Sequence, residues 1–336
     1  MDNVLSCKSF RRFGVEIELN TLDGKIKNLE PGSALDDAVY ISNAVYIANL
    51  VNKITEDTVK ICKWHYTHNN KHWVVKPDSS CGLEVCSPVL KGGNGLDKLL
   101  FLIDAFGKDE NINADERCSL HVHINVSDLN DKQLASVIAY WIKCEYFIFS
   151  GFPDHRKNNR YCQFIGMSDI FEHDVDYSPQ ELIYKMSHVK YYSLNTYHLY
   201  KKRRKAIEFR IAENDFCLNP FLVKSWILFL IHFVEVAKFM PNPPPYSSDN
   251  PWSSLLWLDS EDVIDFLRFN TRLSEGLEEV RDWFLMRCES NGYNTNLPGI
   301  WSNEAREADY YIICEFIERH KINRNSNLQD LKFGFP

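Results

Sequence analysis

Several signatures that would each assign a function class are missing from the sequence. Its ten cysteines include no Cys-x-x-Cys pair, so a structural zinc site of the usual spacing is not expected. No G-x-x-x-x-G-K-[ST] segment occurs, so a nucleotide would have to bind without the common glycine-rich phosphate loop. The first residues lack the basic and then apolar plan of a secretory signal, which leads us to expect free thiols and a cytoplasmic location.

Long apolar runs and an excess of positive charge are also missing. The longest apolar stretch, residues 226–234, is too short to span a bilayer, so no membrane contact is expected. The formal net charge of −8 argues against broad non-specific nucleic-acid binding, although a local basic track leaves a nucleic-acid contact open. A chain of 336 residues with 45% hydrophobic and 25% charged residues can bury a large core and is typical of a globular enzyme.

The order of the expected elements indicates a mixed fold of strands and helices. Alternating hydrophobicity predicts strands near residues 13–20, 84, 119–126 and 206–212, and a hairpin over 60–78. Apolar residues at helical spacing predict helices near 35–54, 96–106, 129–150, from 179 onward, and 220–239. Ser127-Asp128 is expected to open the third of these helices and Gly151 to close it. A proline-rich break over 241–251 separates a catalytic domain over 1–240 from an expected helical annex over 241–336, packed on the same domain.

Four of the predicted strands carry polar side chains on one face. Residues two apart in a strand point the same way, and the residues between them here are apolar and suit a buried face. The polar residues are Glu16 with Glu18, Glu84, His121 with His123, and Glu208 with Arg210. Their repetition predicts one sheet face lined with metal ligands.

The residue types on this face favour a hard divalent cation. Mg²⁺ and Mn²⁺ take oxygen ligands and leave positions for water or substrate phosphates, and several glutamates with one or two histidines favour them over zinc. Arg210, two residues from Glu208, would lie beside the metal-bound group and could neutralise a phosphoryl group in transfer. The set therefore points to ATP-dependent chemistry.

Each pair also has a structural interpretation. The acid pair of the first strand could be the solvated face of an edge strand, and the two histidines could pack or hydrogen-bond structurally. Glu208 and Arg210 could form an exposed ion pair. The occurrence of all four together is hard to obtain from solvated strands alone, so the metal-site hypothesis is favoured.

The ordered set of motifs resembles the amidoligase family, carboxylate–amine ligases related to glutamine synthetase and glutamate–cysteine ligase. The motifs are RFGVEIEL, KPDSSCGLEVCSPVL, CSLHVHINV, RYC, YSLN and IEFRIAE. The resemblance implies an α+β fold with a curved, mainly antiparallel sheet that forms a half-barrel, with helices on its outer face. It also implies ATP and Mg²⁺ (or Mn²⁺) in the funnel, phosphorylation of a carboxylate, and attack of an amine on the acyl phosphate.

The resemblance also implies roles for individual residues. It makes metal ligands of Glu16, Glu18, Glu84, Glu208 and one or both of His121 and His123, with Asp78 as a weaker third-metal or substrate candidate. It makes Arg210 the group that steadies the transferring phosphate, and it places Arg160 and Asn195 near nucleotide or substrate. Family members usually have Gly before the His-x-His pair, where this chain has Ser119-Leu120.

A basic run over residues 201–205 lies just before the strand of Glu208. Lys205 is three residues from that glutamate, or about 10 Å along a strand, so Arg203 and Lys205 are candidates for contact with ATP phosphates or an anionic acceptor. The alternative is an ordinary solvated loop.

Two other functions stay open. A phosphotransferase of the guanidino-kinase type would also use Mg²⁺ and ATP but would release no free phosphate. A catalytically silent relative would bind metal or nucleotide and act through the helical annex. For a ligase the partners would be an amino-acid or amine donor and a carboxylate acceptor, which could be a small molecule, a peptide or a modified base.

Overall fold

The computed structural model describes residues 11–20, 34–62, 71–157, 159–165, 177–201, 205–238 and 286–287. The chain forms two compact units. Residues 1–125 and 206–231 make up unit 1, and residues 126–205 and 232–336 make up unit 2. The predicted domain boundary near residue 240 and almost all of the predicted annex lie outside the described residues, so both stay predictions.

Unit 1 is built on an open sheet whose strands follow the order β2-β3-β4-β1-β5-β7. The strands are β1 (Phe13–Leu19), β2 (Val59–Ile61), β3 (Trp73–Asp78), β4 (Gly82–Cys86), β5 (Ser119–Asn125) and β7 (Ala206–Glu213). All neighbours pair antiparallel except β2 and β3. The expected mixed fold with a mainly antiparallel sheet is therefore confirmed, whereas the half-barrel curvature stays a prediction.

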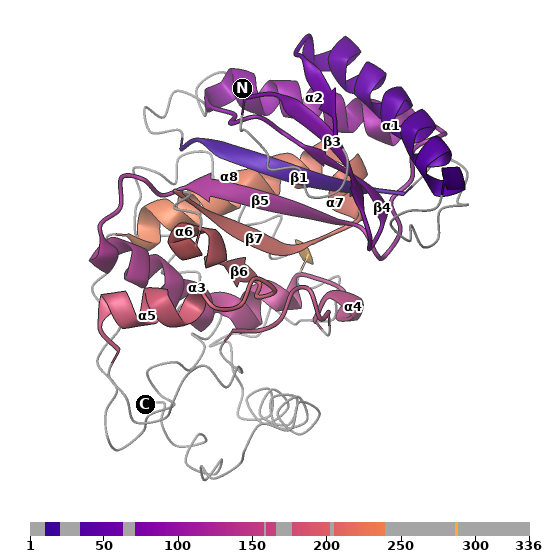
Figure 1. The fold of residues 1–336 in the computed structure, drawn as a ribbon. Coiled ribbons are helices and arrows are strands. Elements are labelled where there is room, and N and C mark those ends of the chain that lie inside the picture. The colour runs from indigo at the N-terminus through magenta and orange to yellow at the C-terminus, as the bar shows by residue number, and fades with distance from the viewer. Residues whose placement is uncertain are drawn as a thin grey trace. The chain divides into compact units, whose positions relative to one another are not determined.

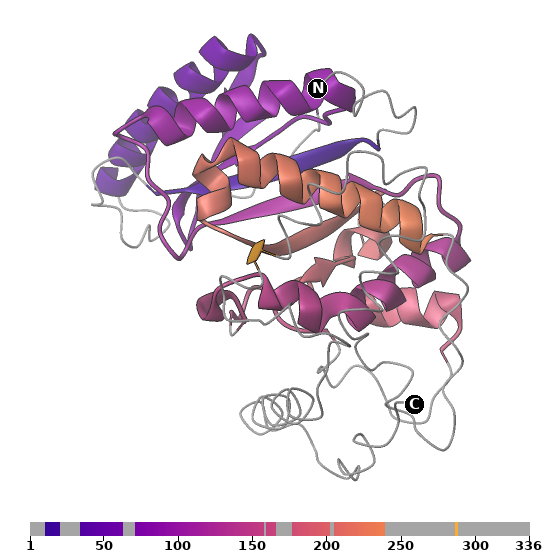
Figure 2. The same ribbon diagram turned by 180° about the vertical axis from the view of Figure 1, so that it is seen from behind.

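Helices cover one face of this sheet. Unit 1 contains α1 (Ala34–Thr55), α2 (Gly92–Lys108), α7 (Asp215–Leu218) and the first part of α8 (Pro220–Ala237). In both views α2 and α8 lie over the same side of the strands (Figures 1 and 2). The apolar stripe of α2 is fully buried and consists of Leu96, Leu99, Leu102, Ile103 and Phe106. These residues recur at three- and four-residue spacing, so they form the face of the helix that packs inward.

Unit 2 is mainly helical. Its elements are α3 (Asp131–Ser150), α4 (Asp154–Lys157), α5 (Pro179–Met186), β6 (Leu194–Asn195), α6 (Tyr197–Lys201) and the end of α8. The expected opening of α3 at Ser127-Asp128 is wrong, because the N-cap is Asn130, which forms a reciprocal capping box with Gln133. The expected end at Gly151 is confirmed.

Helix α8 is long and apolar enough to cross a membrane by length and composition. In the structure 78% of it is buried, and a core helix of a soluble protein passes the same test. It is the only such helix among the described residues.

The expected hairpin over residues 60–78 is wrong. Strand β2 pairs with β3 in parallel, with Val59 opposite Trp73 and Ile61 opposite Val75. Two parallel neighbours cannot be joined by a tight turn, because the chain must return to the end where the first strand began. Strand β3 instead forms its antiparallel hairpin with β4.

Candidate active site

The polar side chains of unit 1 project from one face of the sheet, as the alternation predicts. On β1 the residues Val15, Ile17 and Leu19 are buried and apolar, while Glu16 and Glu18 point to the opposite side. We call that side the acid face and define it by Glu16, Glu18, Glu84, His121 and Glu208. All of them except Glu16 are at least nine-tenths buried.

Strand register arranges these side chains in three rows across the sheet. One row contains Lys76, Glu84 and Glu18, the next contains Cys86, Glu16 and His121, and the third contains Gly14, His123 and Glu208. Directly opposed side chains lie about 4.5–5.5 Å apart at Cβ, which is close enough for shared ligation.

A β-bulge brings the last strand into position. The register of β5 against β7 shifts between Leu120 and Val122, so two residues of β7 there oppose one residue of β5. Without the extra residue His123 would oppose the apolar Phe209, whereas with it His123 opposes Glu208. The bulge thus turns the carboxylate of Glu208 onto the acid face.

Glu16 lies at the centre of the acid face and contacts both histidines. Its Oε2 is 3.5 Å from Nδ1 of His121, and its Oε1 is 3.3 Å from Nε2 of His123. The same Nδ1 of His121 is 3.5 Å from Oε1 of Glu208, which also accepts from Arg210. Glu16, His121 and Glu208 each offer a ligand atom within 4.8 Å of the others, a spacing that suits one metal ion.

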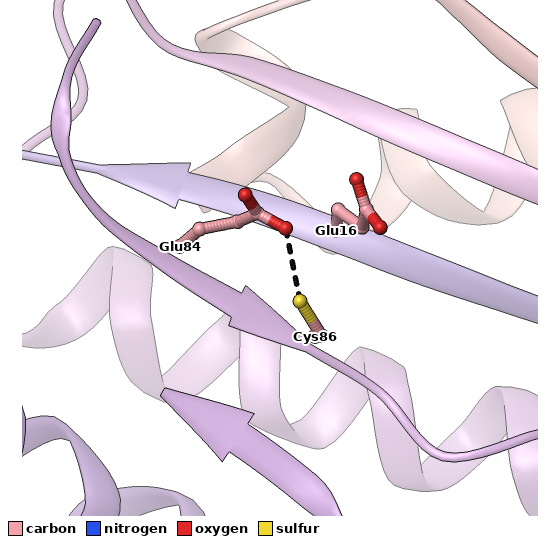
Figure 3. Close-up of side chains that lie close together, drawn as sticks. All are labelled: Glu16, Glu84 and Cys86. Carbon is pink, nitrogen blue, oxygen red and sulfur yellow. Dashed lines mark hydrogen bonds between the residues drawn. The ribbon is translucent and has the colours of Figure 1, made fainter. Parts of the chain in front are cut away.

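A second group forms between Glu16 and β4. Figure 3 shows Glu84 and Cys86 on β4 with Glu16 on the neighbouring strand, all on the near side of the strands. The Cys86 thiol donates to Oε1 of Glu84 at 2.9 Å, and Nζ of Lys76 lies 2.8 Å from the same oxygen. Glu16, Glu84 and Cys86 again offer ligand atoms within 4.8 Å of one another.

Glu18 belongs to a third group, at the turn between β3 and β4. Glu18, Asp78 and Cys81 offer ligand atoms within 4.8 Å of one another. Asp78 also stabilises the turn, because its Oδ1 accepts from the Ser80 backbone N–H at 2.7 Å and from the Ser80 hydroxyl. The turn ends at Gly82, whose φ of 121° is a conformation that side chains disfavour.

Burial raises the pKa of two of these carboxyls. Burial, with the charges of Asp78 and Glu84, raises the pKa of Glu18 to about 8, although a hydrogen bond from Ser119 opposes the shift. Burial and the neighbouring Glu16 raise the pKa of Glu84 to about 7, against the opposing charge of Lys76. In the absence of a further cation, Glu18 therefore retains its proton at neutral pH and Glu84 is partly protonated.

Glu16 and Glu208 behave in the opposite way. Burial raises the pKa of each, but His123 and His121 outweigh it at Glu16 and hold that pKa well below its ordinary value. Arg210 and His123 outweigh burial at Glu208 and lower its pKa too. Burial and the charge of Arg210 lower the pKa of His121, so this ring is neutral at neutral pH.

If fully ionised, the carboxyl groups on this side of the sheet would outnumber the cations. Five carboxyl groups lie there, from the four glutamates of the acid face and Asp78, against the two permanent cations Lys76 and Arg210. Buried carboxylates without a counter-charge are costly, so the set suits divalent cations. Four glutamates with one imidazole are the donors that Mg²⁺ and Mn²⁺ accept.

The predicted site residues divide between the two units. Glu16, Glu18, Asp78, Glu84, His121, His123, Glu208 and Arg210 come together in unit 1. The other described candidates lie in unit 2: Arg160 is exposed over the Tyr161 ring, Asn195 is buried on β6, and Lys205 is exposed. Arg203 lies outside the described residues.

Three residues at the site were not among those predicted. Lys76, Cys86 and Ser119 each contact a carboxylate of the acid face. Their spacing was a usable signal, since each lies two residues from a predicted site residue on the same strand and must share its face.

Comparisons with known proteins identify the family. No curated protein matches the chain. A bifunctional glutathione synthetase from Pasteurella multocida has a similar structure with a TM-score of 0.34 and 10% sequence identity, over 84% of this chain and 46% of that chain. The chain thus spans less than half the length of that enzyme. The model of the family described as "Putative amidoligase enzyme" matches residues 9–216, well over half of the 336 residues, so the chain belongs to the amidoligase family.

Proposed function

We propose that the protein is an ATP- and Mg²⁺-dependent (or Mn²⁺-dependent) carboxylate–amine ligase that forms an amide bond through an acyl-phosphate intermediate. The observation that carries the proposal is the position of Glu16, which belongs both to the group with His121 and Glu208 and to the group with Glu84. One carboxylate between two candidate metal positions is the arrangement expected where two cations act on one phosphate chain.

The acid face divides naturally between the cations. Glu16, His121 and Glu208 would hold one ion, Glu16 with Glu84 would hold another, and Glu18 with Asp78 offers a third position. Bound cations would neutralise the ATP phosphates and the phosphoryl group in transfer. Without them, the excess of carboxylates would repel both ATP and a carboxylate acceptor, since like charges in a buried site interact strongly.

The two permanent cations have separate tasks. Arg210 is held against Glu208 on the bulged strand, and the fork of its guanidinium suits the oxygens of a phosphoryl group. Lys76 lies against Glu84. Burial lowers the pKa of Lys76, but the charges of Glu84 and Glu16 raise that pKa by more, so the ammonium group stays protonated. Each cation would stabilise negative charge that develops during transfer.

The proposal includes partners and a setting. The donor is an amino acid or another amine, and the acceptor carboxylate belongs to a small molecule, a peptide or a modified base. The contacts of Arg160, Asn195, Arg203 and Lys205 with nucleotide or acceptor, the half-barrel curvature of the sheet and a cytoplasmic location belong to the same proposal. The family resemblance supports the half-barrel and the contacts of Arg160 and Asn195. The basic run next to the strand of Glu208 supports the contacts of Arg203 and Lys205, and the cysteine content supports the cytoplasmic location.

The test is to identify the products. The protein is incubated with ATP, Mg²⁺, mixed amino acids and a host extract, and ADP, phosphate and new amides are measured by mass spectrometry. A ligase releases equal amounts of ADP, phosphate and amide. ADP with a phosphorylated product and no free phosphate would indicate a phosphotransferase, and no turnover with intact metal binding would indicate a silent relative.

Matched variants make this test specific. Glu16→Gln removes the charge shared by the two groups and should abolish amide formation. Glu116→Gln removes a charge from an exposed position and should leave it unchanged. Equal activity in both variants would contradict the assignment of the acid face to the chemistry.

A further inference from the structure

Ser119 joins two parts of the acid face. It is buried at the start of β5, two residues before His121 and on the same side of the strand. Its Oγ lies 2.7 Å from Oε2 of Glu18 and 2.9 Å from Nε2 of His121. Ser119 therefore links Glu18 to the group that contains Glu16 and Glu208.

The direction of the two hydrogen bonds follows from the number of protons. A serine hydroxyl has one hydrogen to donate and two lone pairs that accept. Glu18 retains a proton without a cation, but once cations occupy the acid face its carboxylate is ionised and can only accept. The hydroxyl hydrogen then goes to Glu18, which is the direction of the 2.7 Å contact. The Oγ lone pair must then accept from the ring, which requires the proton of the neutral His121 to be on Nε2.

The other ring nitrogen faces the carboxylates. With the proton on Nε2, the lone pair of His121 is on Nδ1. This atom lies 3.5 Å from Oε2 of Glu16 and 3.5 Å from Oε1 of Glu208. Nδ1 and the two carboxylate oxygens then lie close together, and none of the three has a hydrogen to donate to the others. A cation between them would interact favourably with all three.

We propose that Ser119 is a positioning residue that fixes the proton of His121 on Nε2 and thereby presents Nδ1 as the metal-binding atom beside Glu16 and Glu208. The inference rests on the proposed function only in taking the acid face as a metal site. It adds that metal binding depends on the Ser119 hydroxyl, which contacts no cation itself. The hydroxyl acts through its hydrogen bond to His121, which selects the tautomer of this ligand.

The loss of this hydroxyl has a defined consequence. In Ser119→Ala the Nε2 proton has no acceptor on Ser119, and the alternative tautomer can donate its Nδ1 proton to Glu16 or Glu208. That proton would occupy the position needed for the metal. Removal of such a supporting partner costs about 10- to 100-fold in metal affinity.

The first experiment measures the tautomer in the unaltered protein. Histidine is labelled with ¹⁵N, and long-range ¹H–¹⁵N spectra are recorded with saturating Mg²⁺, with the His121 signals assigned by their loss in His121→Gln. We expect a protonated Nε2 and an unprotonated Nδ1. A proton on Nδ1 would overturn the proposal, and this measurement does not depend on whether any Ser119 variant folds.

The second experiment measures Mn²⁺ affinity by electron paramagnetic resonance. We expect Ser119→Ala to weaken the tightest site 10- to 100-fold and Ser119→Thr, which keeps the hydroxyl, to stay within a few-fold of the parent. Ser136→Ala removes a buried hydroxyl from unit 2, where it donates to the Ala237 carbonyl, and should leave Mn²⁺ affinity unchanged. Parent-like affinity in Ser119→Ala would overturn the proposal.

The outcomes separate this inference from the proposed function. Ser119-dependent Mn²⁺ binding without any amide product would refute the ligase function and leave the role of Ser119 standing. Amide formation with parent-like Mn²⁺ affinity in Ser119→Ala would support the ligase and refute the role of Ser119.

Discussion

The metal-free protein should lose stability as the pH rises from 5 to 8, because Glu18 must give up a proton inside the fold. Burial and the charges of Asp78 and Glu84 raise its pKa from 4.5 to about 8. A carboxyl whose pKa is raised by folding contributes stability that is fully present below its unfolded pKa. This contribution is lost as the pH rises through the folded pKa.

The size of the effect follows from the shift. A change of about 3.5 pKa units corresponds to roughly 5 kcal/mol at 1.36 kcal/mol per unit, reached once the pH exceeds both pKa values. A folded domain has a total stability of about 5–15 kcal/mol. The loss is thus large enough to lower the urea midpoint clearly, and the raised pKa of Glu84 acts in the same direction.

The assay is urea unfolding in the presence of a chelator between pH 5 and 8.5, with Glu18→Gln beside the parent. The glutamine cannot ionise, so the variant should show a flatter pH dependence and exceed the parent in stability by several kcal/mol at pH 8. Mg²⁺ should restore the parent at pH 8 with release of protons, because ionised carboxyls bind it best. Glu116→Gln, at an exposed position, is the control.

Two results would refute this reasoning. A parent protein of constant stability from pH 5.5 to 8 in chelator would mean that Glu18 is not forced to retain its proton. A Glu18→Gln variant with the pH dependence of the parent would assign the effect to another group.

Three further predictions concern the strand of Glu208 and the segment before it. Arg210→Ala should lower amide formation by about 10²–10³-fold while Mn²⁺ affinity stays near that of the parent, because it removes one donor to the transferring phosphoryl group; near-full turnover would contradict this role. Glu208→Gln should weaken Mn²⁺ binding, measured by electron paramagnetic resonance, because the ion loses a charged ligand, and unchanged affinity would remove Glu208 from the site. Replacing Arg203, Arg204 and Lys205 with Ser should raise the KM for ATP or acceptor and make that KM less dependent on salt. Kinetics identical to those of the parent across a salt series would make the basic run an ordinary solvated loop.

The sequence predicts the acid face because strand alternation is a local property. Glu16 and Glu18 must share a face wherever β1 lies, and the same holds for His121 with His123. The apolar residues between them determine which face is buried. What alternation cannot predict is which strands are neighbours, so the central position of Glu16 became visible only in the fold.

The features that sequence reasoning missed depend on long-range pairing. The β7 bulge that turns Glu208 toward His123 has no local signature, since it arises from the register of β5 against β7. The parallel pairing of β2 with β3 likewise is a property of the strand order and not of either strand's own sequence. Lys76 and Ser119, in contrast, could have been predicted from local sequence. Lys76 lies two residues from Asp78 and Ser119 two residues from His121, so each shares the face of that residue.

The central claim is that carboxylates of three strands and one imidazole of a fourth hold divalent cations for ATP-dependent chemistry. Its most direct test is a crystal structure with Mn²⁺ and a non-hydrolysable ATP analogue, recorded at the Mn absorption edge. We predict at least two anomalous peaks on the acid face, one bound by Glu16, His121 Nδ1 and Glu208 and one bound by Glu84, both in contact with the phosphates. Manganese peaks elsewhere, or a nucleotide bound away from the acid face, would contradict the account.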